Sequence, residues 1–319
     1  MSADRQPSHI AALEAGGTKC ICAVGRTPDE LRLLANRLEV PSDSGPQQVL
    51  ARITAWLSTQ HAREPLQAIG IASFGPLDLD PASPSYGSIT STPKPGWRNT
   101  DWLGEFARTL PGVPVAIDTD VNGAALGEWQ WGAAQGLDDF VYLTMGTGIG
   151  GGAMVGGRLV HGLLHPEMGH MRVPRIAGDD FAGVCPFHGD CWEGLCSGPA
   201  LQARTGTAAH GIAADDPAWG YLLRYTAHAI GNIVCTLSPR RIILGGSVRK
   251  AGALGEAAYF AGLRRELQRS LNGYVTSAAL RGNDEGGGID DYIVPPALGD
   301  EAGVCGAMAL AQRRVALQP

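Results

Sequence analysis

Apolar residues form two short runs on either side of a glycine pair near the start of the chain. Residues 10–25 read IAALEAGGTKCICAVG, and apolar runs around so tight a turn predict a β-hairpin. Residues 140–156, FVYLTMGTGIGGGAMVG, repeat the arrangement around a turn rich in glycine and threonine. The repetition predicts one structural device used twice, in two related halves that face one ligand.

Longer segments carry apolar residues at helical spacing. Residues 46–60 have this spacing with a proline near the start, where the missing N–H of proline is tolerated. A third strand, 241–248, reads RIILGGSV and ends in a glycine pair. Strands that alternate with helices predict an α/β architecture, and 319 residues are typical of two domains. Further helices are predicted over 121–131, 198–204, 216–236, 252–271 and 301–314.

Charge and cysteine count narrow the class of protein. The net charge of −6 disfavours a nucleic-acid partner, which normally needs a basic face. No run approaches about 18 apolar residues, so we expect no membrane span. The first residues show no signal peptide, so we expect a cytoplasmic protein. Seven cysteines, an odd number spread along the chain, do not resemble a disulfide framework.

Glycine is enriched, at 45 of 319 residues or about 14%, against an average near 7%. The glycines show no period of three, which excludes collagen, and they lie beside Val, Ile, Thr and Met, which excludes a flexible linker. Such an excess indicates tight turns or close approach of the backbone to a ligand. Outside the glycine-rich motifs described next, we expect the glycines to be ordinary turns.

The glycine-rich turns have the groups that bind phosphate, namely converging N–H groups without side chains in the way. Residues 14–19, E-A-G-G-T-K, offer two glycines, a hydroxyl and a cation, although they lack the Walker A pattern. Residues 146–157 hold seven glycines in twelve positions. No predicted helix follows them, which argues against a Rossmann fingerprint. Each turn alone could be only a tight hairpin, but the further glycine pair at 245–246 counts against that alternative.

Histidine and cysteine are concentrated in one segment: four of the eight histidines fall in 161–188. Cys185, His188 and Cys191 form a C-x2-H-x2-C pattern, and three such ligands in seven residues suit tetrahedral Zn²⁺. A closed site needs a fourth ligand. We expect His170, with Cys196 as the competitor. The alternative is a set of reduced cysteines close together by chance.

Together these motifs resemble the ROK family of sugar kinases, within the actin/hexokinase-like ATPase superfamily, and are similar to its bacterial fructokinase branch. The resemblance covers nearly the whole chain. It implies a two-domain, actin-like (ribonuclease H-like) α/β fold with a nucleotide and sugar cleft between the domains. The N-terminal domain would comprise 1–124 and 300–319, and the C-terminal domain 125–299.

The resemblance also implies which residues bind ATP. Most family members have Asp where this chain has Glu14. Glu14 would likewise keep a carboxylate near the Mg²⁺ that accompanies ATP. The implied nucleotide contacts are the first phosphate motif, Gly16, Gly17, Thr18 and Lys19, the second phosphate motif, Gly146, Thr147 and Gly148, then Pro199, and the adenosine motif, Gly245, Gly246, Ser247 and Val248.

Two carboxylates, Asp118 and Asp120, lie in the segment IDTDVNGAALGE, 117–128. Phosphoryl transfer to a sugar hydroxyl needs a carboxylate that accepts the hydroxyl proton. Two residues apart at a strand end, both would lie on one face. The family's N-D-x-N segment implies that Asp120 is the catalytic base and Asp118 a supporting residue. The alternative is a helix N-cap before 121–128.

The sugar side is also implied by the resemblance. Glu167 to His170 fits the family's E-x-G-H motif, so His170 would complete a structural zinc site with Cys185, His188 and Cys191. Many members have an Asn just before the P-G-W portion of 87–98, where this chain has Pro93 and Lys94, so that contact is not transferred. Trp97 and Trp102 are expected to anchor the loop. The implied sugar contacts are Glu167, His170, Glu193, Gly75 and Asp118.

The resulting hypothesis is an ATP-dependent kinase that phosphorylates D-fructose, and the family resemblance implies a homodimer. One alternative is a ROK kinase for glucose, mannose or N-acetylmannosamine. A sugar-sensing repressor would carry an N-terminal helix-turn-helix, whereas only about nine residues precede the first strand. A binding protein without activity is disfavoured by Asp120 and both phosphate turns. Residues 282–291 are expected to form an exposed loop without an assigned role.

Overall fold

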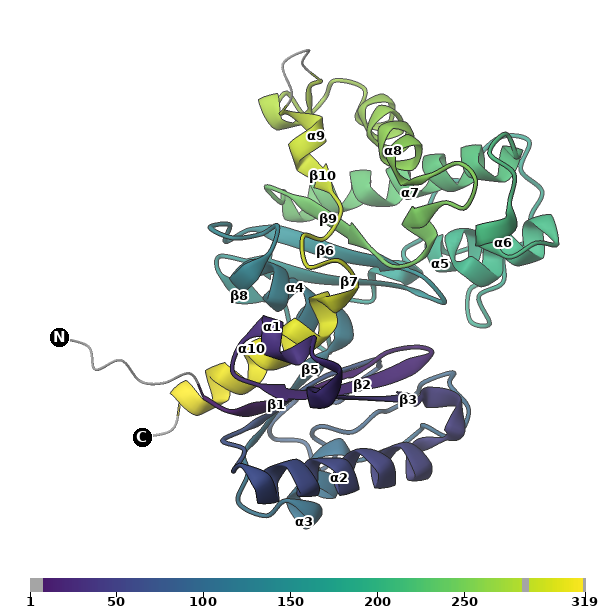
Figure 1. The fold of residues 1–319 in the computed structure, drawn as a ribbon. Coiled ribbons are helices and arrows are strands. Elements are labelled where there is room, and N and C mark those ends of the chain that lie inside the picture. The colour runs from purple at the N-terminus through teal and green to yellow at the C-terminus, as the bar shows by residue number, and fades with distance from the viewer. Residues whose placement is uncertain (1–7, 283–286, 318–319) are drawn as a thin grey trace. The chain divides into compact units, whose positions relative to one another are not determined.

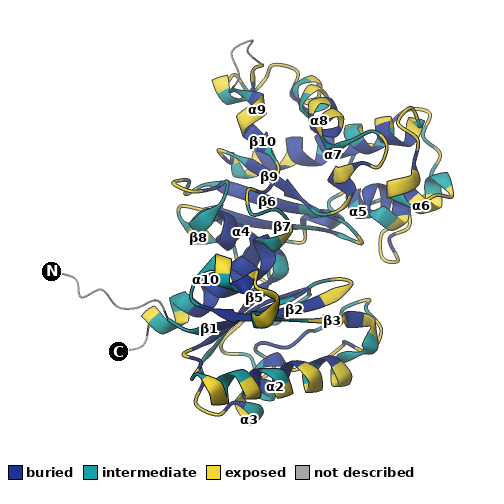
Figure 2. Cartoon of the chain, viewed as in Figure 1, coloured by how far each residue is buried: buried dark blue, intermediate teal, exposed yellow. Residues whose placement is uncertain are grey.

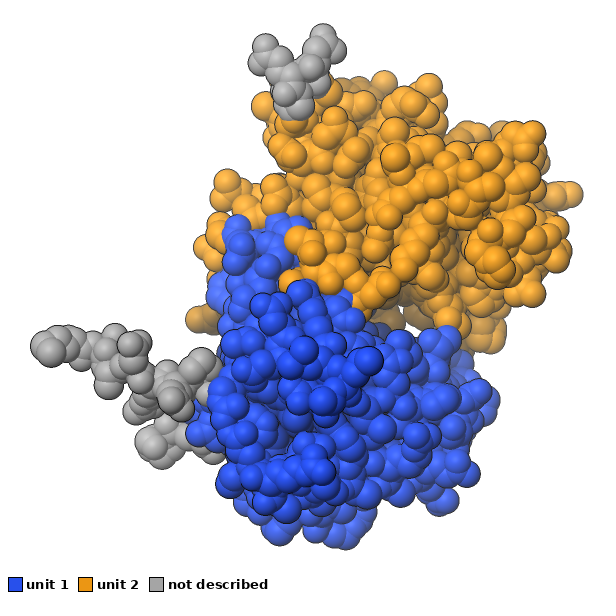
Figure 3. Space-filling view, in the orientation of Figure 1, with its two compact units in different colours: residues 1–135, 160–165, 301–319 blue, residues 136–159, 166–300 orange. Residues whose placement is uncertain are grey.

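The computed structural model describes residues 8–282 and 287–317, and divides the chain into two compact units. Unit 1 comprises Met1–Gln135, Val160–His165 and Glu301–Pro319, and unit 2 comprises Gly136–Leu159 and Pro166–Asp300 (Figure 3). The predicted domain boundary at 124/125 would cut the helix Asp120–Trp131, which lies wholly in unit 1.

The sheet of unit 1 has the strand order β3-β2-β1-β4-β5 (Figure 1). Its strands β1, β2 and β3 pair antiparallel, while β1, β4 and β5 pair parallel. The predicted hairpin at 10–25 is therefore present as β1 and β2. The elements of this unit are β1 Ile10–Ala15, β2 Lys19–Gly25, α1 Pro28–Leu31, β3 Arg37–Pro41, α2 Pro46–Arg63, β4 Ile69–Ser73, α3 Trp102–Thr109, β5 Val115–Thr119, α4 Asp120–Trp131 and α10 Ala302–Ala316.

Alternate side chains of β1 enter different cores, as the two-residue period of a strand requires. Leu13 packs in the core shared with α2 and α3, whereas Ala12 packs in the core shared with α10. The ten residues 302–311 of α10 are all buried, which a helix against the middle of a sheet explains (Figure 2). The two faces of this sheet are thus covered by different helices.

The packing of α10 depends on glycine. A Cβ at Gly306 would overlap the carbonyl oxygen of Gly123 in α4, and a Cβ at Gly70 in β4 would overlap the carbonyl oxygen of Ala307. These glycines allow backbone to contact backbone. The expectation that the remaining glycines are ordinary turns is therefore wrong for this set. Because they have no side chain, they allow α10 to pack directly against the backbone of α4 and β4.

Unit 2 repeats the topology of unit 1. Its sheet has the order β10-β9-β6-β7-β8. As in unit 1, the first three strands along the chain, β6, β7 and β8, pair antiparallel, while β6, β9 and β10 pair parallel. The predicted hairpin at 140–156 is present as β6 and β7. The elements are β6 Phe140–Met145, β7 Ile149–Val155, β8 Arg158–Leu159, α5 Trp192–Cys196, α6 Gly198–Thr205, α7 Pro217–Leu237, β9 Ile242–Gly245, α8 Glu256–Leu271, α9 Ile289–Tyr292 and β10 Ile293–Val294.

Some predicted bounds differ from those in the structure. The strand predicted over 241–248 ends at Gly245, because Gly246 has φ +84°, in the left-handed region. The helix predicted from 252 begins at Glu256, because Gly255 also has a positive φ. In the predicted loop 282–291, residues 283–286 lie outside the described residues, and α9 begins within the segment. No described helix is long and apolar enough to cross a membrane.

Candidate functional site

The first phosphate turn joins β1 and β2 in unit 1. The Gly16 N–H donates to Lys19 O at 2.9 Å, which closes the turn. Gly17 and Thr18 lie at its exposed tip. Lys94, in the loop 76–100, donates from its Nζ to the carbonyl oxygens of Gly16 and Gly17. Lys94 therefore contacts the turn itself.

The carboxylates of Glu14 and Asp120, both in unit 1, interact electrostatically. Glu14 lies in β1, and burial, with the nearby charges of Asp120 and Glu301, raises its pKa to about 7. Its Oε2 is buried and has no hydrogen-bond partner in the described part of the chain. A buried carboxylate oxygen without a partner, near a second carboxylate, is the kind of group that a divalent cation would satisfy.

Asp120 is the first residue of α4, and not part of the strand as the sequence predicted, because β5 ends at Thr119. Thr119 is the N-cap, and its side chain accepts the N–H of Asn122 at 3.1 Å. The capping alternative therefore applies to Thr119, which leaves Asp120 free for another role. Burial raises the pKa of Asp120 to about 6, and the Val121 N–H holds its Oδ1 at 2.9 Å.

Asp118 lies in β5 and is 5% exposed. Its carboxylate contacts His161 Nε2 at 2.9 and 3.1 Å and accepts Asn122 Nδ2 at 2.8 Å. The contact with His161, 43 residues away along the chain, has no local sequence signal. Asp118 is thus held by several protein groups in the strand that leads to Asp120.

In unit 2 the structure brings together several predicted nucleotide contacts. The Gly198 N–H, in the first turn of α6 beside Pro199, donates to Gly146 O at 2.8 Å. A Cβ on Gly146 would lie 3.7 Å from Ser247 Oγ, in the turn after β9. A Cβ on Gly246 would overlap the backbone of Met145, so only glycine fits there. The second turn, the start of α6 and the predicted adenosine motif therefore form one cluster.

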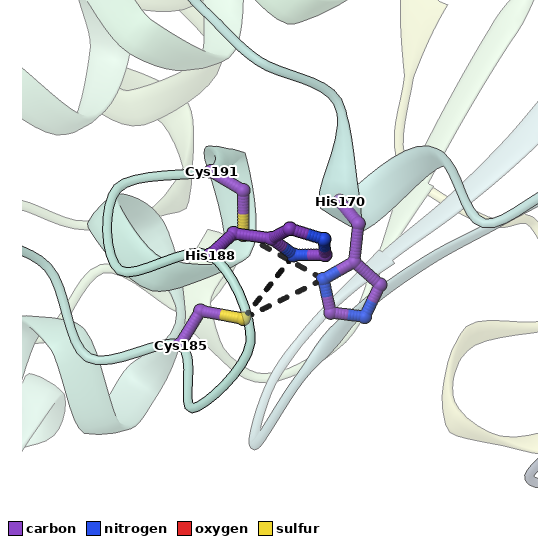
Figure 4. Close-up of side chains that lie close together, drawn as sticks. All are labelled: His170, Cys185, His188 and Cys191. Carbon is purple, nitrogen blue, oxygen red and sulfur yellow. Dashed lines mark hydrogen bonds between the residues drawn. The ribbon is translucent and has the colours of Figure 1, made fainter. Parts of the chain in front are cut away.

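The four predicted zinc ligands converge in unit 2 (Figure 4). Their ligand atoms all lie within 4.8 Å of one another. His170 Nδ1 lies 3.7 Å from Cys185 Sγ and 3.6 Å from Cys191 Sγ, and His188 Nδ1 lies 3.6 Å from Cys185 Sγ. Zn–S and Zn–N bonds of about 2.3 and 2.1 Å in a tetrahedron give S···N edges of about 3.6 Å. The four residues therefore fit a tetrahedral zinc ion.

Cys196, the competing ligand, lies outside this cluster. It is fully buried in α5, and its Sγ is directed to Leu222 O at 3.9 Å. Cys185 instead lies in a tight loop, where it exchanges backbone hydrogen bonds with Gly189 at 3.1 and 2.9 Å. This loop explains how three ligands within seven residues can surround one point.

The predicted sugar contacts lie in different surroundings. Glu193 Oε2 accepts the Ile149 N–H at 2.9 Å, so α5 also braces the second phosphate turn. Glu167 is exposed and precedes the short helix Met168–His170 that carries a zinc ligand. Gly75, in unit 1, has no room for a side chain, because a Cβ would lie 2.9 Å from Leu77 N. Their roles toward a sugar stay predictions.

The loop 76–100 is anchored by Trp97 within it and by Trp102, the first residue of α3, which follows it. Trp97 and Trp102 are both fully buried, and their indole N–H groups donate to Ser42 O at 3.0 Å and Ser73 Oγ at 3.1 Å. The expectation that they anchor the loop is confirmed.

Residues 10–314 match the profile of the ROK family, which is nearly the whole chain. The chain belongs to the ROK family. Among its relatives in that family are the fructokinase of Pediococcus pentosaceus, 39% identical over 95% of this chain and 97% of the relative, and the fructokinase of Zymomonas mobilis, 41% identical over 94% and 95%. The ROK hexokinase of Thermus thermophilus matches 97% of this chain and 99% of its own with a TM-score of 0.74 and 26% identity.

These findings confirm the ROK resemblance, the two-part actin-like α/β fold and the classification as a sugar kinase. Each of the two five-stranded sheets contains one of the two hairpins that the sequence repeats.

Proposed function

We propose that this ROK protein is an ATP-dependent fructokinase that converts D-fructose to fructose 6-phosphate. The choice of sugar is supported by the fructokinases of Pediococcus pentosaceus and Zymomonas mobilis, which are 39% and 41% identical over nearly their whole length. The observation that carries the chemistry is the carboxylate of Asp120, at the start of α4, with a pKa raised by burial to about 6.

Asp120 acts as the general base. Its pKa of about 6 keeps it mostly ionised at neutral pH while making it a better proton acceptor than an ordinary aspartate. The Val121 N–H fixes Oδ1 and thereby the orientation of the carboxylate. The carboxylate takes the proton of the sugar hydroxyl as the hydroxyl oxygen bonds to the γ-phosphorus, and ADP leaves with the electron pair of the broken P–O bond. Asp118 supports the segment that carries the base.

Glycine-rich turns bind the phosphates. In unit 1 this is the turn 16–19, and in unit 2 it is the turn 146–148. Pro199 and the adenosine motif 245–248 complete the nucleotide site. Mg²⁺, when bound with ATP, neutralises charge on the phosphates. Glu14 is the residue of this chain that fits it, because one of its carboxylate oxygens is buried and unpartnered.

The zinc ion is structural. His170, Cys185, His188 and Cys191 supply four protein ligands, which leaves no position for a reacting water. The zinc segment carries Glu193, which holds Ile149 N–H at the second turn. The metal therefore shapes both this turn and the segment with Glu167 and Glu193, which we assign to sugar hydroxyls with Gly75.

A ROK kinase for glucose, mannose or N-acetylmannosamine is the alternative. A panel of these sugars and fructose, each with MgATP in a coupled ADP-release assay, separates the two. We expect the largest kcat/KM with fructose, and a wide margin in favour of another sugar would contradict the proposal. The homodimer implied by the family resemblance is checked by light scattering on the purified protein.

A further inference from the structure

The carbonyl groups of the first phosphate turn are held by residues from two other segments. Gly16 O and Gly17 O accept from Lys94 Nζ at 3.3 and 2.8 Å. Gly17 O also accepts the hydroxyl of Ser42 at 3.1 Å, and Thr18 O accepts the Ser42 N–H at 3.0 Å. Three consecutive carbonyl groups are therefore fixed by Lys94 and Ser42.

This arrangement sets the direction of the N–H groups in the same peptides. The peptide bonds of the turn are trans, and in a trans peptide the C=O and N–H point to opposite sides. The peptides whose oxygens bind Lys94 carry the N–H groups of Gly17 and Thr18, which therefore point away from Lys94. In the described part of the chain, neither N–H has a hydrogen-bond partner. Successive free N–H groups of this kind bind anions.

Lys94 is itself fixed in place. Its Nζ lies 4.3 Å from the centre of the Phe74 ring and 5.3 Å from that of Trp97, which is fully buried. An ammonium group has three donors, and three acceptors surround this one: the two glycine carbonyl oxygens and Ser42 Oγ. Burial lowers the pKa of Lys94 from its ordinary value. With all donors engaged, Lys94 has none left for a sugar.

We propose that Lys94, with Ser42, is a positioning residue for the nucleotide: the two hold the carbonyl groups of the turn on one side so that the N–H groups of Gly17 and Thr18 face the phosphates of ATP. This inference rests on the proposed function, since it takes the turn to be a phosphate site. It assigns Lys94 to the nucleotide and not to the sugar, although Lys94 lies in the loop that the family resemblance places on the sugar side.

The test measures nucleotide binding without sugar, by isothermal titration calorimetry with MgAMP-PNP and, separately, with adenosine. Lys94→Met keeps the aliphatic chain and removes the donors. It should weaken MgAMP-PNP about tenfold, because charge-assisted hydrogen bonds hold the turn, and leave adenosine within about twofold. The KM for fructose should also stay within about twofold. A merely structural role would lower the melting temperature without separating AMP-PNP from adenosine.

Two further variants complete the experiment. Ser42→Ala removes the hydroxyl that bonds to Gly17 O and Lys94, and should weaken MgAMP-PNP in the same sense by about threefold. It also tests the inference if Lys94→Met does not fold. Arg98→Met is the matched control, because Arg98 is an exposed cation in the same loop, and it should leave both affinities unchanged.

The outcomes separate the inference from the proposed function. One set of results has the wild type bind MgAMP-PNP while Lys94→Met binds it with the same affinity, or shows only a raised KM for fructose. Either result would overturn the inference and leave the proposed kinase function intact. Unchanged or tighter MgAMP-PNP binding by Ser42→Ala would also overturn it, since Lys94 would then act on the phosphate directly. Wild-type protein without affinity for MgAMP-PNP would overturn both.

Discussion

Replacing Asp120 by Asn should inactivate the enzyme and stabilise it. Burial raises the pKa of Asp120 from its ordinary value of 3.8 to about 6, so the folded protein disfavours the ionised form of this side chain. A difference of about two pKa units corresponds to a destabilisation of up to about 3 kcal/mol when the group is ionised in both the folded and the unfolded state. Asn keeps the oxygen that accepts the Val121 N–H and removes the charge.

The gain in stability should depend on pH. Above about pH 7, Asp120 is ionised in the folded and the unfolded protein, so the destabilisation is fully present and the variant gains the most. As the pH falls through 6 the folded-state carboxyl takes up a proton, and the difference between variant and wild type shrinks toward zero near pH 4. In wild-type enzyme, kcat/KM should fall below about pH 6, because a protonated Asp120 cannot accept the hydroxyl proton.

The assay combines thermal unfolding at pH 8 and pH 5 with turnover in the coupled assay. For Asp120→Asn we expect a melting temperature higher by up to about 5 °C at pH 8, a smaller rise at pH 5, and a kcat lower by about 10²–10⁴. Asp29→Asn is the control, because the Asp29 side chain is 90% exposed, and it should change stability by less than about 0.5 kcal/mol. Retained turnover would refute the base assignment, and an unchanged or lower melting temperature at pH 8 would refute the burial argument.

Three further predictions concern stability and metal content. Purified protein should contain about one equivalent of zinc, and Cys191→Ser should lower both the zinc content and the melting temperature; less than about half an equivalent in the wild type would count against the site. Gly306→Ala, whose Cβ overlaps the Gly123 carbonyl oxygen, should destabilise the protein by about 3 kcal/mol or more in thermal unfolding, whereas Gly220→Ala, at an exposed helical glycine with open space, should stabilise it by about 0.5–1 kcal/mol. Burial raises the pKa of Asp179, but the hydrogen bonds from an arginine and a tyrosine outweigh it and lower that pKa to about 2. Asp179→Asn should therefore lose about 2 kcal/mol at pH 7, measured by urea unfolding, and the loss should shrink as the pH falls from 4 to 2; a loss that is the same at pH 7 and pH 2 would contradict the pairing.

The elements that the sequence predicted are those with a local signal. Both hairpins follow from apolar runs that flank glycine turns, and three zinc ligands follow from the spacing of Cys185, His188 and Cys191. The strand β4, Ile69–Ser73, escaped prediction because all five of its residues are buried, so it has no alternation of polar and apolar positions.

Other features depend on contacts that spacing does not reveal. The glycines of α4 and α10 fall 183 positions apart at Gly123 and Gly306, so their backbone contact appears only in the folded chain. The contact of Asp118 with His161 and that of Lys94 with the first turn likewise join distant segments. The only sequence signal for Lys94 was its place in the loop 87–98, which pointed toward the sugar.

The central claim is most directly tested by product analysis in a competition experiment. The purified protein, MgATP and equal concentrations of fructose and glucose are incubated, and the phosphorylated products are identified by ³¹P NMR and mass spectrometry. Because both sugars compete for the same enzyme, the ratio of initial products gives the ratio of the kcat/KM values. We predict fructose 6-phosphate as the main product, formed by the wild type and not by Asp120→Asn. A main product of glucose 6-phosphate, or equal product from the two proteins, would contradict the account.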